Sequence, residues 1–273
     1  MNDLSYTAKV FKTVWVSDVH LGTKGSRAKE FLEFLKTIEC EKIFLVGDII
    51  DGWQLSKRWY WPQTHNDVVQ KILEKAKRGT EIIFIPGNHD EVARDFIGLT
   101  MGGIKVKDDD IHYTADGKKF WVVHGDLFDN VIQHARWLAY IGDWAYVFLL
   151  KTNAVFNAIR RLFKLPYWSL SQYLKSKVKL AVSFMSAFEK SIATETRRRG
   201  CDGVICGHIH KAEMKMVEDI MYANDGDWVE SMTALVENFD GKLEIIEWSK
   251  TKGKLTPVEG CLLYTSPSPR DTA

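Results

Sequence analysis

The sequence predicts an α/β fold in which buried strands alternate with amphipathic helices. Five short apolar runs are rich in β-branched and aromatic residues, as is typical of strands buried on both faces. Helix-like segments at residues 27–39 and 66–78 separate the first three runs, which is the strand–helix–strand order of a layered sheet. Each run also ends in polar side chains, and ligands of such sheets gather beyond the carboxyl ends of the strands.

The elements follow one another in a simple order along the chain. The runs and the polar side chains after them are residues 14–16 with Asp18 and His20, 43–46 with Asp48, 82–85 with Asn88, 120–123 with His124, and 203–206 with His208 and His210. The first strand is expected to begin near residue 10, and the second helix to end at Gly79. Further strands are predicted at residues 214–217, 220–223, 233–238 and 243–248, joined by Asp-Gly turns.

Residues 136–200 carry no strand signal and are helical, aromatic and basic. Residues 131–200 contain 12 Lys or Arg against 3 Asp or Glu, a balance of +9 in a chain whose net charge is +1. The rest of the chain is therefore acidic, as expected if acidic metal ligands lie there. The whole-chain charge favours neither nucleic acid nor acidic lipid as a partner.

Cysteine usage and hydropathy predict a cytoplasmic protein. The four cysteines form no Cys-x-x-Cys pair, the first residues have no signal-peptide pattern, and no apolar stretch reaches about 18 residues. We expect one domain over residues 1–260, with a helical insert at about 131–200. Residues 261–273 change abruptly in composition and resemble a translated sequencing adapter, so we expect a non-native tail; a genuine disordered tail is the alternative.

The polar side chains after the strands form a coherent set of ligands for two divalent metal ions. Carboxylate, amide and imidazole groups together suit transition ions better than magnesium, and this ligand set favours Mn²⁺. The carboxylate of Asp48 has two oxygens and can bridge two ions. We divide the ligands into Asp18, His20, Asp48 and His210 for one ion, and Asp48, Asn88, His124 and His208 for the other. Ion pairs about 3.5–4 Å apart generate a nucleophile at neutral pH and clamp a phosphoryl group.

Each motif alone has a structural alternative. Asp-x-His and Gly-Asp occur in many ordinary loops, whereas Asn-His-Asp after a Pro-Gly turn and Gly-His-x-His are more specific. Five of the eight histidines fall within these motifs, and five such elements in this order are hard to obtain by chance. We therefore favour a metal site, and expect His65, His112 and His134 to be structural or exposed.

Together the motifs D-x-H, G-D, G-N-H-D, H and G-H-x-H, over about residues 14–210, resemble those of the calcineurin-like metallophosphoesterases. The resemblance implies a four-layered α/β/β/α sandwich with a helical insert, and the division of ligands given above. It also implies that His89 contacts the phosphate and stabilises or protonates the departing oxygen. Two interpretations of Asp90 stay open: it fixes the His89 imidazole, or it is a plain surface carboxylate.

Within that family the chain is similar to the UDP-2,3-diacylglucosamine diphosphatases in length, in its helical insert and in residues 222–228. That similarity implies hydrolysis of a nucleotide-linked lipid at the inner face of the cell membrane, with Mn²⁺ and with the insert as a lid that receives acyl chains. One departure is His89, where the best-matched enzymes have Arg. This difference leaves the metal ligands intact, but the identity of the lipid substrate stays open.

The insert and an aromatic segment supply candidate substrate contacts. An apolar stripe at helical spacing includes Trp144 and Phe148, while Lys175 and Lys179 share a helix face. An apolar stripe beside basic side chains suits an element that contacts lipid, although the stripe could instead pack on the main core. Residues 53–61 are rich in Trp and basic side chains, and could stack on a nucleotide or pack beneath the sheet.

Two other functions could use the same motifs. A general phosphodiesterase or nuclease is expected to show a basic groove, whereas here the positive charge lies on an apolar insert, so nucleic acid is not the expected partner. A non-enzymatic scaffold is expected to have lost ligands, yet all seven positions are filled. We therefore predict a metal-dependent hydrolase of phosphoester or diphosphate bonds.

Overall fold

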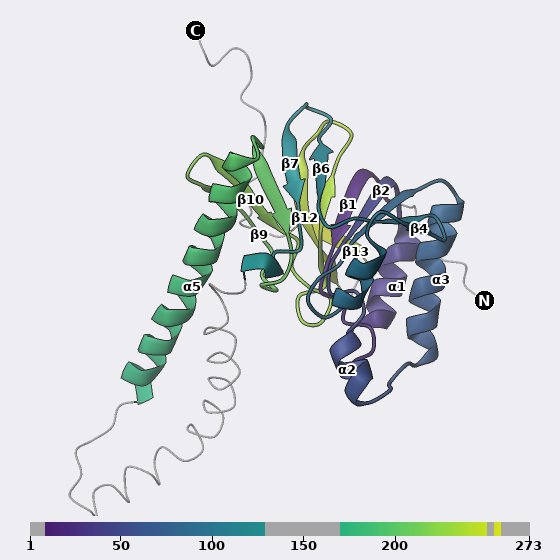
Figure 1. Ribbon diagram of the computed structural model, residues 1–273, viewed down its shortest axis with the longest axis horizontal. Helices are drawn as coiled ribbons and strands as arrows, with labels where there is room; N and C mark the ends of the chain where they lie inside the picture. The colour runs from purple at the N-terminus through teal and green to yellow at the C-terminus, as the bar shows by residue number, and fades with distance from the viewer. Residues whose placement is uncertain (1–8, 129–169, 250–253, 258–273) are drawn as a thin grey trace, which may run out of the picture. The chain divides into compact units, whose positions relative to one another are not determined.

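The computed structural model describes residues 9–128, 170–249 and 254–257, which form two β-sheets flanked by helices (Figure 1). The chain divides into two compact units, Met1–Asp126 with Ala193–Ala273 and Leu127–Ile192. Both sheets, and all seven predicted metal ligands, belong to the first unit. No helix in the described part of the chain is long and apolar enough to cross a membrane.

The larger sheet has the strand order β13-β12-β11-β1-β2-β3-β5-β4. Its strands are β1 (Lys9–Val16), β2 (Ile38–Val46), β3 (Glu81–Ile85), β4 (Thr100–Met101), β5 (Ile104–Val106), β11 (Thr233–Glu237), β12 (Leu243–Ser249) and β13 (Lys254–Pro257). The pairs β1–β2, β2–β3 and β3–β5 are parallel, while β11 joins β1 from the other side as an antiparallel neighbour. The carboxyl ends of the first three strands therefore meet at one edge.

The smaller sheet has the strand order β6-β7-β8-β10-β9. Its strands are β6 (Asp110–Tyr113), β7 (Lys119–Val122), β8 (Gly203–Cys206), β9 (Glu213–Val217) and β10 (Ile220–Asn224). A buried apolar cluster joins the two sheets, with Trp15 and Phe44 from the larger sheet and Phe120 and Ile205 from the smaller one. The continuous apolar runs of the sequence arise because these strands are covered on both faces.

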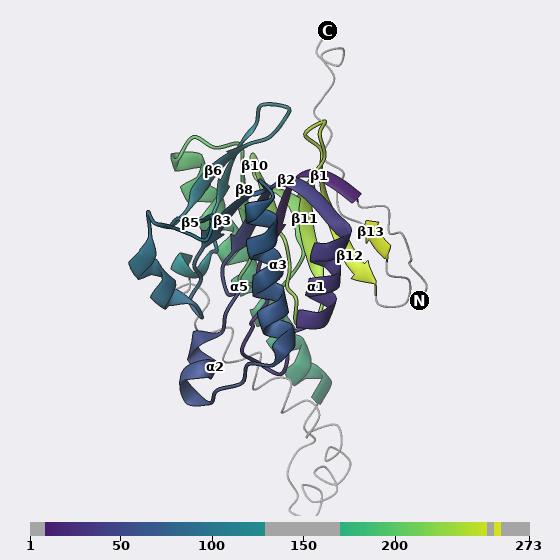
Figure 2. The same cartoon turned by 90° about the vertical axis from the view of Figure 1, so that its right-hand side faces the viewer.

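Helices α1 (Ala28–Thr37) and α3 (Gln63–Lys77) lie side by side on the outer face of the larger sheet (Figure 2). Phe31, Phe34 and Leu35 of α1 are fully buried in the cluster that also holds Val14 and Val16 of β1. The short elements α2 (Gly52–Lys57) and η1 (Glu91–Phe96) follow β2 and β3, and η2 (Asp126–Phe128) follows β7.

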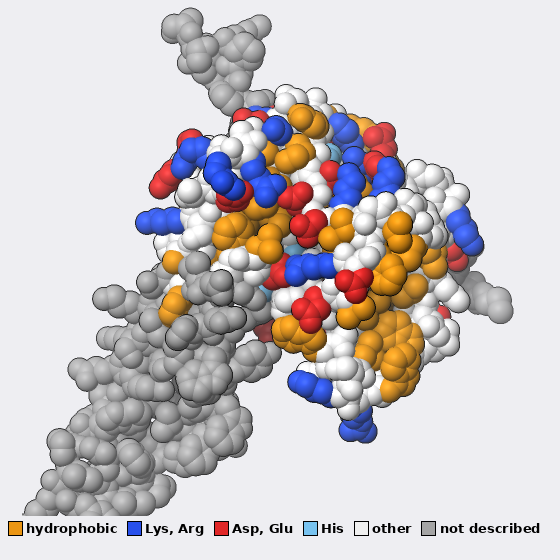
Figure 3. Space-filling view, viewed as in Figure 1, with side chains coloured by type: hydrophobic (Ala, Val, Ile, Leu, Met, Phe, Trp, Pro, Cys, Tyr) orange, Lys and Arg blue, Asp and Glu red, His pale blue; other side chains and the backbone are white. Residues whose placement is uncertain are grey.

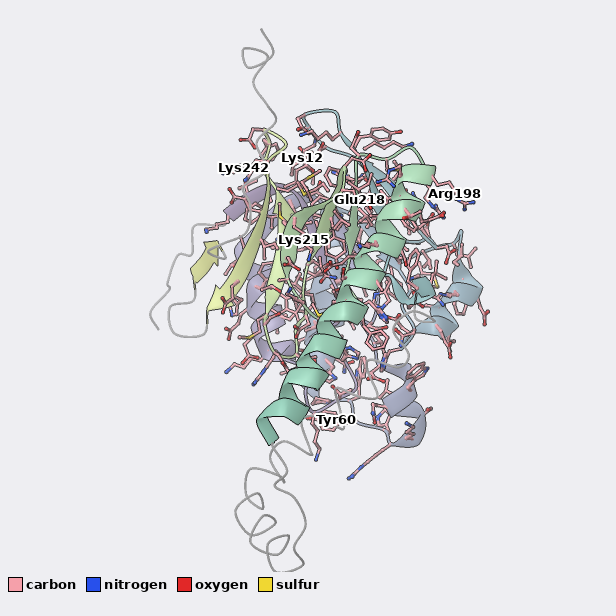
Figure 4. The ribbon with its side chains drawn as sticks, turned by 90° about the vertical axis from the view of Figure 1, so that its left-hand side faces the viewer. Lys12, Tyr60, Arg198, Lys215, Glu218 and Lys242 are labelled. Atoms are coloured by element: carbon pink, nitrogen blue, oxygen red, sulfur yellow. The ribbon has the colours of Figure 1, made fainter. Side chains whose placement is uncertain are left out.

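Helix α5 (Leu170–Arg198) leads into β8, and its last turns belong to the first unit. Arg197 forms ion pairs with Glu218 and Asp219 in the turn between β9 and β10; Figure 4 labels Glu218 there and Arg198 at the end of the helix. Arg199 lies over the ring of Trp121, at 4.2 Å, and forms an ion pair with Asp109. Helical residues thus flank the smaller sheet as well, which confirms the layered α/β/β/α expectation.

All strands predicted from the sequence are present, with two corrections to the helices. The first helix ends at Thr37 because Ile38 and Glu39 already pair with β1 as the start of β2. The second begins at Gln63, directly after Pro62, rather than at Asn66. Strands β4, β5, β6 and β13 were not predicted because they are short and carry mixed polar sequences. Most of the predicted insert, and residues 261–273, lie outside the described residues, so both stay predictions.

Candidate metal centre

The loops that follow β1, β2, β3, β7 and β8 carry the seven predicted ligands at one end of the sheets. Six of them fall in two clusters of ligand atoms, and Asn88 follows Gly87, whose backbone lies against Asp48 and His124. Figure 4 shows Tyr60, beyond the carboxyl end of β2, at this end, and Lys12 and Lys242 at the opposite end. Figure 3 shows small areas of histidine surface near the centre of one face, bordered by acidic and basic side chains. The ligands come from both sheets, so the fold must close before the site exists.

The first ligand cluster contains Asp18, His20 and His210, whose ligand atoms lie within 4.8 Å of one another. Asp18 Oδ1 lies 3.0 Å from His210 Nε2 and 3.8 Å from His20 Nε2. Burial alone would raise the pKa of Asp18, but the neighbouring His210 and His20 hold it well below its usual range. This corner of the site therefore offers an ionised carboxylate between two imidazoles.

The second ligand cluster contains Asp48, His124 and His208. His124 donates from Nδ1 to the Val46 carbonyl, at 2.7 Å, which leaves its Nε2 directed at Asp48 Oδ1, 3.5 Å away. Burial opposes the charge on both groups, yet their mutual attraction lowers the pKa of Asp48 to about 2 and raises that of His124 to about 10. The other oxygen of Asp48 lies 3.8 Å from His20 Nε2, so this carboxylate stands between the two clusters.

The polar atoms of the site fit metal ions rather than one another. His20 Nε2, Asp48 Oδ2, Asn88 Oδ1 and His124 Nε2 are buried without a hydrogen-bond partner among the described residues. An unsatisfied buried polar atom costs about 1–3 kcal/mol, and native proteins contain few of them. Nitrogen and oxygen donors converging in this way satisfy the preferences of divalent transition ions.

The backbone of the ligand loops is strained. Five of the seven predicted ligands have left-handed backbone conformations: Asp18 (φ 51°), His20 (φ 50°), Asp48 (φ 54°), His208 (φ 72°) and His210 (φ 54°). Such conformations cost a non-glycine residue about 1–3 kcal/mol each and persist only where the surroundings impose them. Here the loops after β1 and β2 hold each other, because Asp18 N–H donates to the Gly47 carbonyl and His20 N–H to the Asp48 carbonyl.

Two motif glycines are required by close approach. A Cβ on Gly87 would collide with Asp48 and His124, one ligand from each sheet's loops. A Cβ on Gly207 would collide with Ser17 and Asp18. The glycines before Asn88 and His208 thus allow the backbone to pass directly against the ligand side chains.

Asp90 neither fixes the His89 imidazole nor lies on the surface, the two alternatives predicted from the sequence. It is buried, and its carboxylate accepts four backbone N–H groups, those of Gly87, Asp48, Ile49 and Ile50, at 2.6, 3.2, 2.8 and 3.3 Å. Both interpretations of Asp90 were therefore wrong, because the carboxylate turns away from His89 and holds the loop that carries Asp48. Burial, with a contribution from Asp48, raises its pKa.

Asp51, for which no role was predicted, is the carboxylate that contacts the predicted catalytic histidine. Its Oδ2 lies 3.1 Å from His89 Nδ1 and 3.2 Å from His20 Nδ1, while Oδ1 accepts Gln54 N–H and caps α2. The contacts with His20 and His89 outweigh burial and hold the pKa of Asp51 well below its usual range. The spacing Asp48-x-x-Asp51 was the available signal, since both follow the same strand.

Ser17 and the segment after β10 support Asp18 from behind. Ser17 Oγ lies 2.6 Å from both Asp18 Oδ2 and Asp225 Oδ1, and His208 N–H donates to the same Asp18 oxygen at 2.8 Å. Burial raises the pKa of Asp225 well above its usual value. A protonated Asp225 can donate to Ser17, whose own hydroxyl then donates to Asp18. The sequence showed residues 222–228 only as a marker of resemblance, because Asn-Asp-Gly looks like an ordinary turn.

The remaining predicted residues are placed as follows. Trp144 and Phe148 lie outside the described residues, and Lys175 and Lys179 lie on α5, where their side chains are not described. His65 is buried and accepts the Gly22 N–H. His112 is buried too, with its Nε2 2.8 Å from Glu237 Oε2; His134 lies outside the described residues.

Several known proteins are similar to this chain. The UDP-2,3-diacylglucosamine hydrolase of Blochmanniella pennsylvanica is 26% identical over 208 residues, covering 72% of this chain and 78% of the relative. That of Edwardsiella ictaluri is 23% identical over 204 residues, covering 73% of this chain and 76% of the relative. The Zn²⁺ complex of Vps29 from Entamoeba histolytica covers 90% of this chain and 96% of its own, at 14% identity and a TM-score of 0.45.

The family comparison covers every predicted metal ligand. The profile of the calcineurin-like phosphoesterases matches residues 11–212, from β1 to just beyond His210. Matched over nearly three quarters of its length, the chain belongs to the calcineurin-like phosphoesterase family and is a metal-dependent phosphoesterase.

Proposed function

We propose that this phosphoesterase hydrolyses the diphosphate bond of a nucleotide-linked lipid, UDP-2,3-diacylglucosamine or a close analogue, with two Mn²⁺ ions. The observation that carries the proposal is the pair of ligand clusters that meet at Asp48. The names of the curated relatives support the choice of substrate.

In this proposal Asp18, His20, Asp48 and His210 hold one ion, and Asp48, Asn88, His124 and His208 hold the other. When bound, the ion pair supplies the positive charge that activates water and neutralises phosphoryl oxygens. The chain fixes the orientation of the ligand side chains. His124 is held by its hydrogen bond to the Val46 carbonyl, and Asp18 by the Ser17 hydroxyl and the His208 N–H. Ligands anchored in this way keep their geometry as charge shifts during the reaction.

His89 is the proposed proton donor to the departing oxygen. Its Nδ1 faces the Asp51 carboxylate, 3.1 Å from Oδ2, so Nε2 is the ring nitrogen left to face the substrate. That Nε2 lies 4.0 Å from Asp48 Oδ2, beside the second ligand cluster. The side chain is 19% exposed, which allows a substrate to reach it.

We further propose that residues 1–260 act as one domain, and that the insert at about 131–200 is a lid that receives acyl chains. Trp144, Phe148, Lys175 and Lys179 would then contact the lipid. A lipid-bearing substrate places the enzyme in the cytoplasm at the inner face of the cell membrane. A general phosphodiesterase is the second candidate, favoured by the imidazole of His89 where the best-matched lipid enzymes have Arg.

Two measurements test these proposals. Chelation followed by gel filtration should abolish hydrolysis of bis(p-nitrophenyl) phosphate, and Mn²⁺ should restore it more fully than Mg²⁺ at equal concentration; full activity of the stripped protein would refute the metal assignment. UDP-2,3-diacylglucosamine should then be turned over with a higher kcat/KM than the aryl diester. A preference for soluble diesters would favour the general phosphodiesterase.

A separate variant tests the proton donor. His89→Ala should retain both ions and lose about 10²–10⁴ in turnover, the range expected for a positioned general acid. Elemental analysis provides the control, because loss of metal from this variant would show that His89 is a ligand.

A further inference from the structure

Trp53 occupies the first turn of α2, two residues after Asp51, and contacts the predicted proton donor. Its ring centroid lies 4.4 Å from that of His89, with the two planes inclined by 37°. The indole Nε1 lies 3.4 Å from Glu91 Oε1, so the side chain spans the loops that follow β2 and β3. With 43% of its surface exposed, Trp53 forms part of the outer wall beside His89.

The His89 imidazole is thereby bounded by three different groups. Asp51 Oδ2 lies 3.1 Å from Nδ1, and the ring of His20 approaches edge-on, with centroids 4.7 Å apart at 84°. Trp53 packs against the ring from α2. Because Nδ1 lies 3.1 Å from Asp51 Oδ2 without the geometry of a hydrogen bond, the two ring contacts are what define the plane of the imidazole.

This arrangement matters for the direction in which Nε2 points. A misplacement of about 1 Å at a reacting group can cost up to 10²-fold in rate. His20 is itself a proposed metal ligand and cannot adjust to follow His89. Trp53 is therefore the contact through which the plane of the imidazole can be set independently of the metal site.

We propose that Trp53 is a positioning residue for proton donation by His89, an inference that rests on the proposed role of His89. In the step concerned, a water oxygen forms the new bond to phosphorus and loses a proton to solvent. The phosphorus–oxygen bond of the leaving group breaks, its electron pair goes to the departing oxygen, and that oxygen takes the proton from His89 Nε2. His89 then regains a proton from solvent, so atoms and charge balance.

The consequence is a dependence on the leaving group. A departing p-nitrophenolate is stable without a proton, whereas phenolate gains much more from protonation. Loss of Trp53 should therefore slow esters of poor leaving groups more than esters of good ones. A residue that only supported the fold would slow both equally.

The test uses the full chain loaded with Mn²⁺ and two diesters, bis(p-nitrophenyl) phosphate and diphenyl phosphate. Trp53→Ala should lower kcat for the phenyl ester about 10- to 100-fold and for the nitrophenyl ester only about 2- to 3-fold, with KM little changed. Trp53→Phe, which keeps an aromatic ring at the position, should restore most of the loss. Trp59→Ala is the matched control, because Trp59 is 75% exposed and pairs with Trp61 at 6.3 Å.

A double-mutant cycle separates this role from others. In a His89→Ala background, Trp53→Ala should change kcat by less than about twofold, because the group it positions is gone. Equal losses on both esters, a loss confined to KM, or additive effects in the cycle would each overturn the proposal. Since the aryl diesters carry no lipid, failure on UDP-2,3-diacylglucosamine would not affect this result.

A structural measurement keeps the proposal testable without turnover. In a crystal structure of Trp53→Ala, His89 should adopt a second orientation in which Nδ1 has left Asp51. A single conformer with Nδ1 still about 3 Å from Asp51 Oδ2 would overturn the proposal.

Discussion

Asp90→Asn is the substitution whose effect the structure defines most closely. One Asp90 oxygen accepts a short bond from Gly87 (2.6 Å) and a long one from Asp48 (3.2 Å), and the other a short bond from Ile49 (2.8 Å) and a long one from Ile50 (3.3 Å). An Asn side chain keeps only one oxygen. Whichever way it turns, one short and one long bond are lost, and its NH₂ group faces two backbone donors.

The expected cost follows from these lost bonds. A hydrogen bond to a charged group contributes about 1.5–3 kcal/mol, and the long bond contributes less. Removing a carboxylate near Asp48 relieves some repulsion, since Asp48 contributes to raising the pKa of Asp90. We expect a net loss of about 2–3 kcal/mol in the free energy of unfolding, measured on the metal-free protein by urea denaturation.

The same change should loosen the metal site, because the backbone of Asp48 is held in a left-handed conformation. Elemental analysis of Asp90→Asn should show fewer than two bound ions. Asp95→Asn, on an exposed side chain of η1, is the control and should match the parent protein. Unchanged stability and metal content together with slower turnover would refute the reasoning, because Asp90 would then act on His89 after all.

Three further outcomes are expected. Asp48→Ala should lose more bound metal than Asn88→Ala, because Asp48 stands between both clusters and Asn88 offers one neutral oxygen; equal retention in elemental analysis would contradict the bridging role. Replacing Trp144 and Phe148 with Ser should slow an acylated nucleotide diphosphate and spare a small diester; a joint fall with thermal stability would place both side chains in the core. Glu237→Gln should cost about 1–3 kcal/mol at pH 7. Burial raises the pKa of Glu237, but the bond with His112 outweighs it and lowers the pKa below the ordinary 4.5, so this cost should decline as the pH falls below 4.5; a cost that did not change with pH would rule out an ionised Glu237.

Local sequence predicted the strands and the ligands because both leave signals within a few residues. Runs such as residues 43–46 are apolar on both faces, and a ligating side chain follows each run directly. The division into two sheets was not visible in the runs themselves, since a strand buried between two sheets and one buried between a sheet and a helix have the same composition. The division into two sheets was predicted from the resemblance to a known family.

The residues that support the site were harder to predict because their partners are distant in sequence. Ser17 contacts Asp225 across 208 positions, and Asp90 binds the loop 40 to 42 positions before it. Adjacency to His89 made Asp90 a natural choice for orienting the imidazole, yet the turn at Gly87 points its carboxylate the other way. Asp51 does face His89, because it follows the strand that carries Asp48.

The place of β11 beside β1 bears on how the protein is made. All seven proposed metal ligands have left the ribosome once residue 210 emerges, but the neighbour of β1 arrives only with Thr233–Glu237. Until then the nascent chain carries an unpaired edge along Thr13, Val14 and Trp15, the kind of surface that pairs wrongly with other chains. We therefore expect truncated chains that end between residues 210 and 233 to aggregate, and metal uptake to follow the completion of this sheet during biosynthesis.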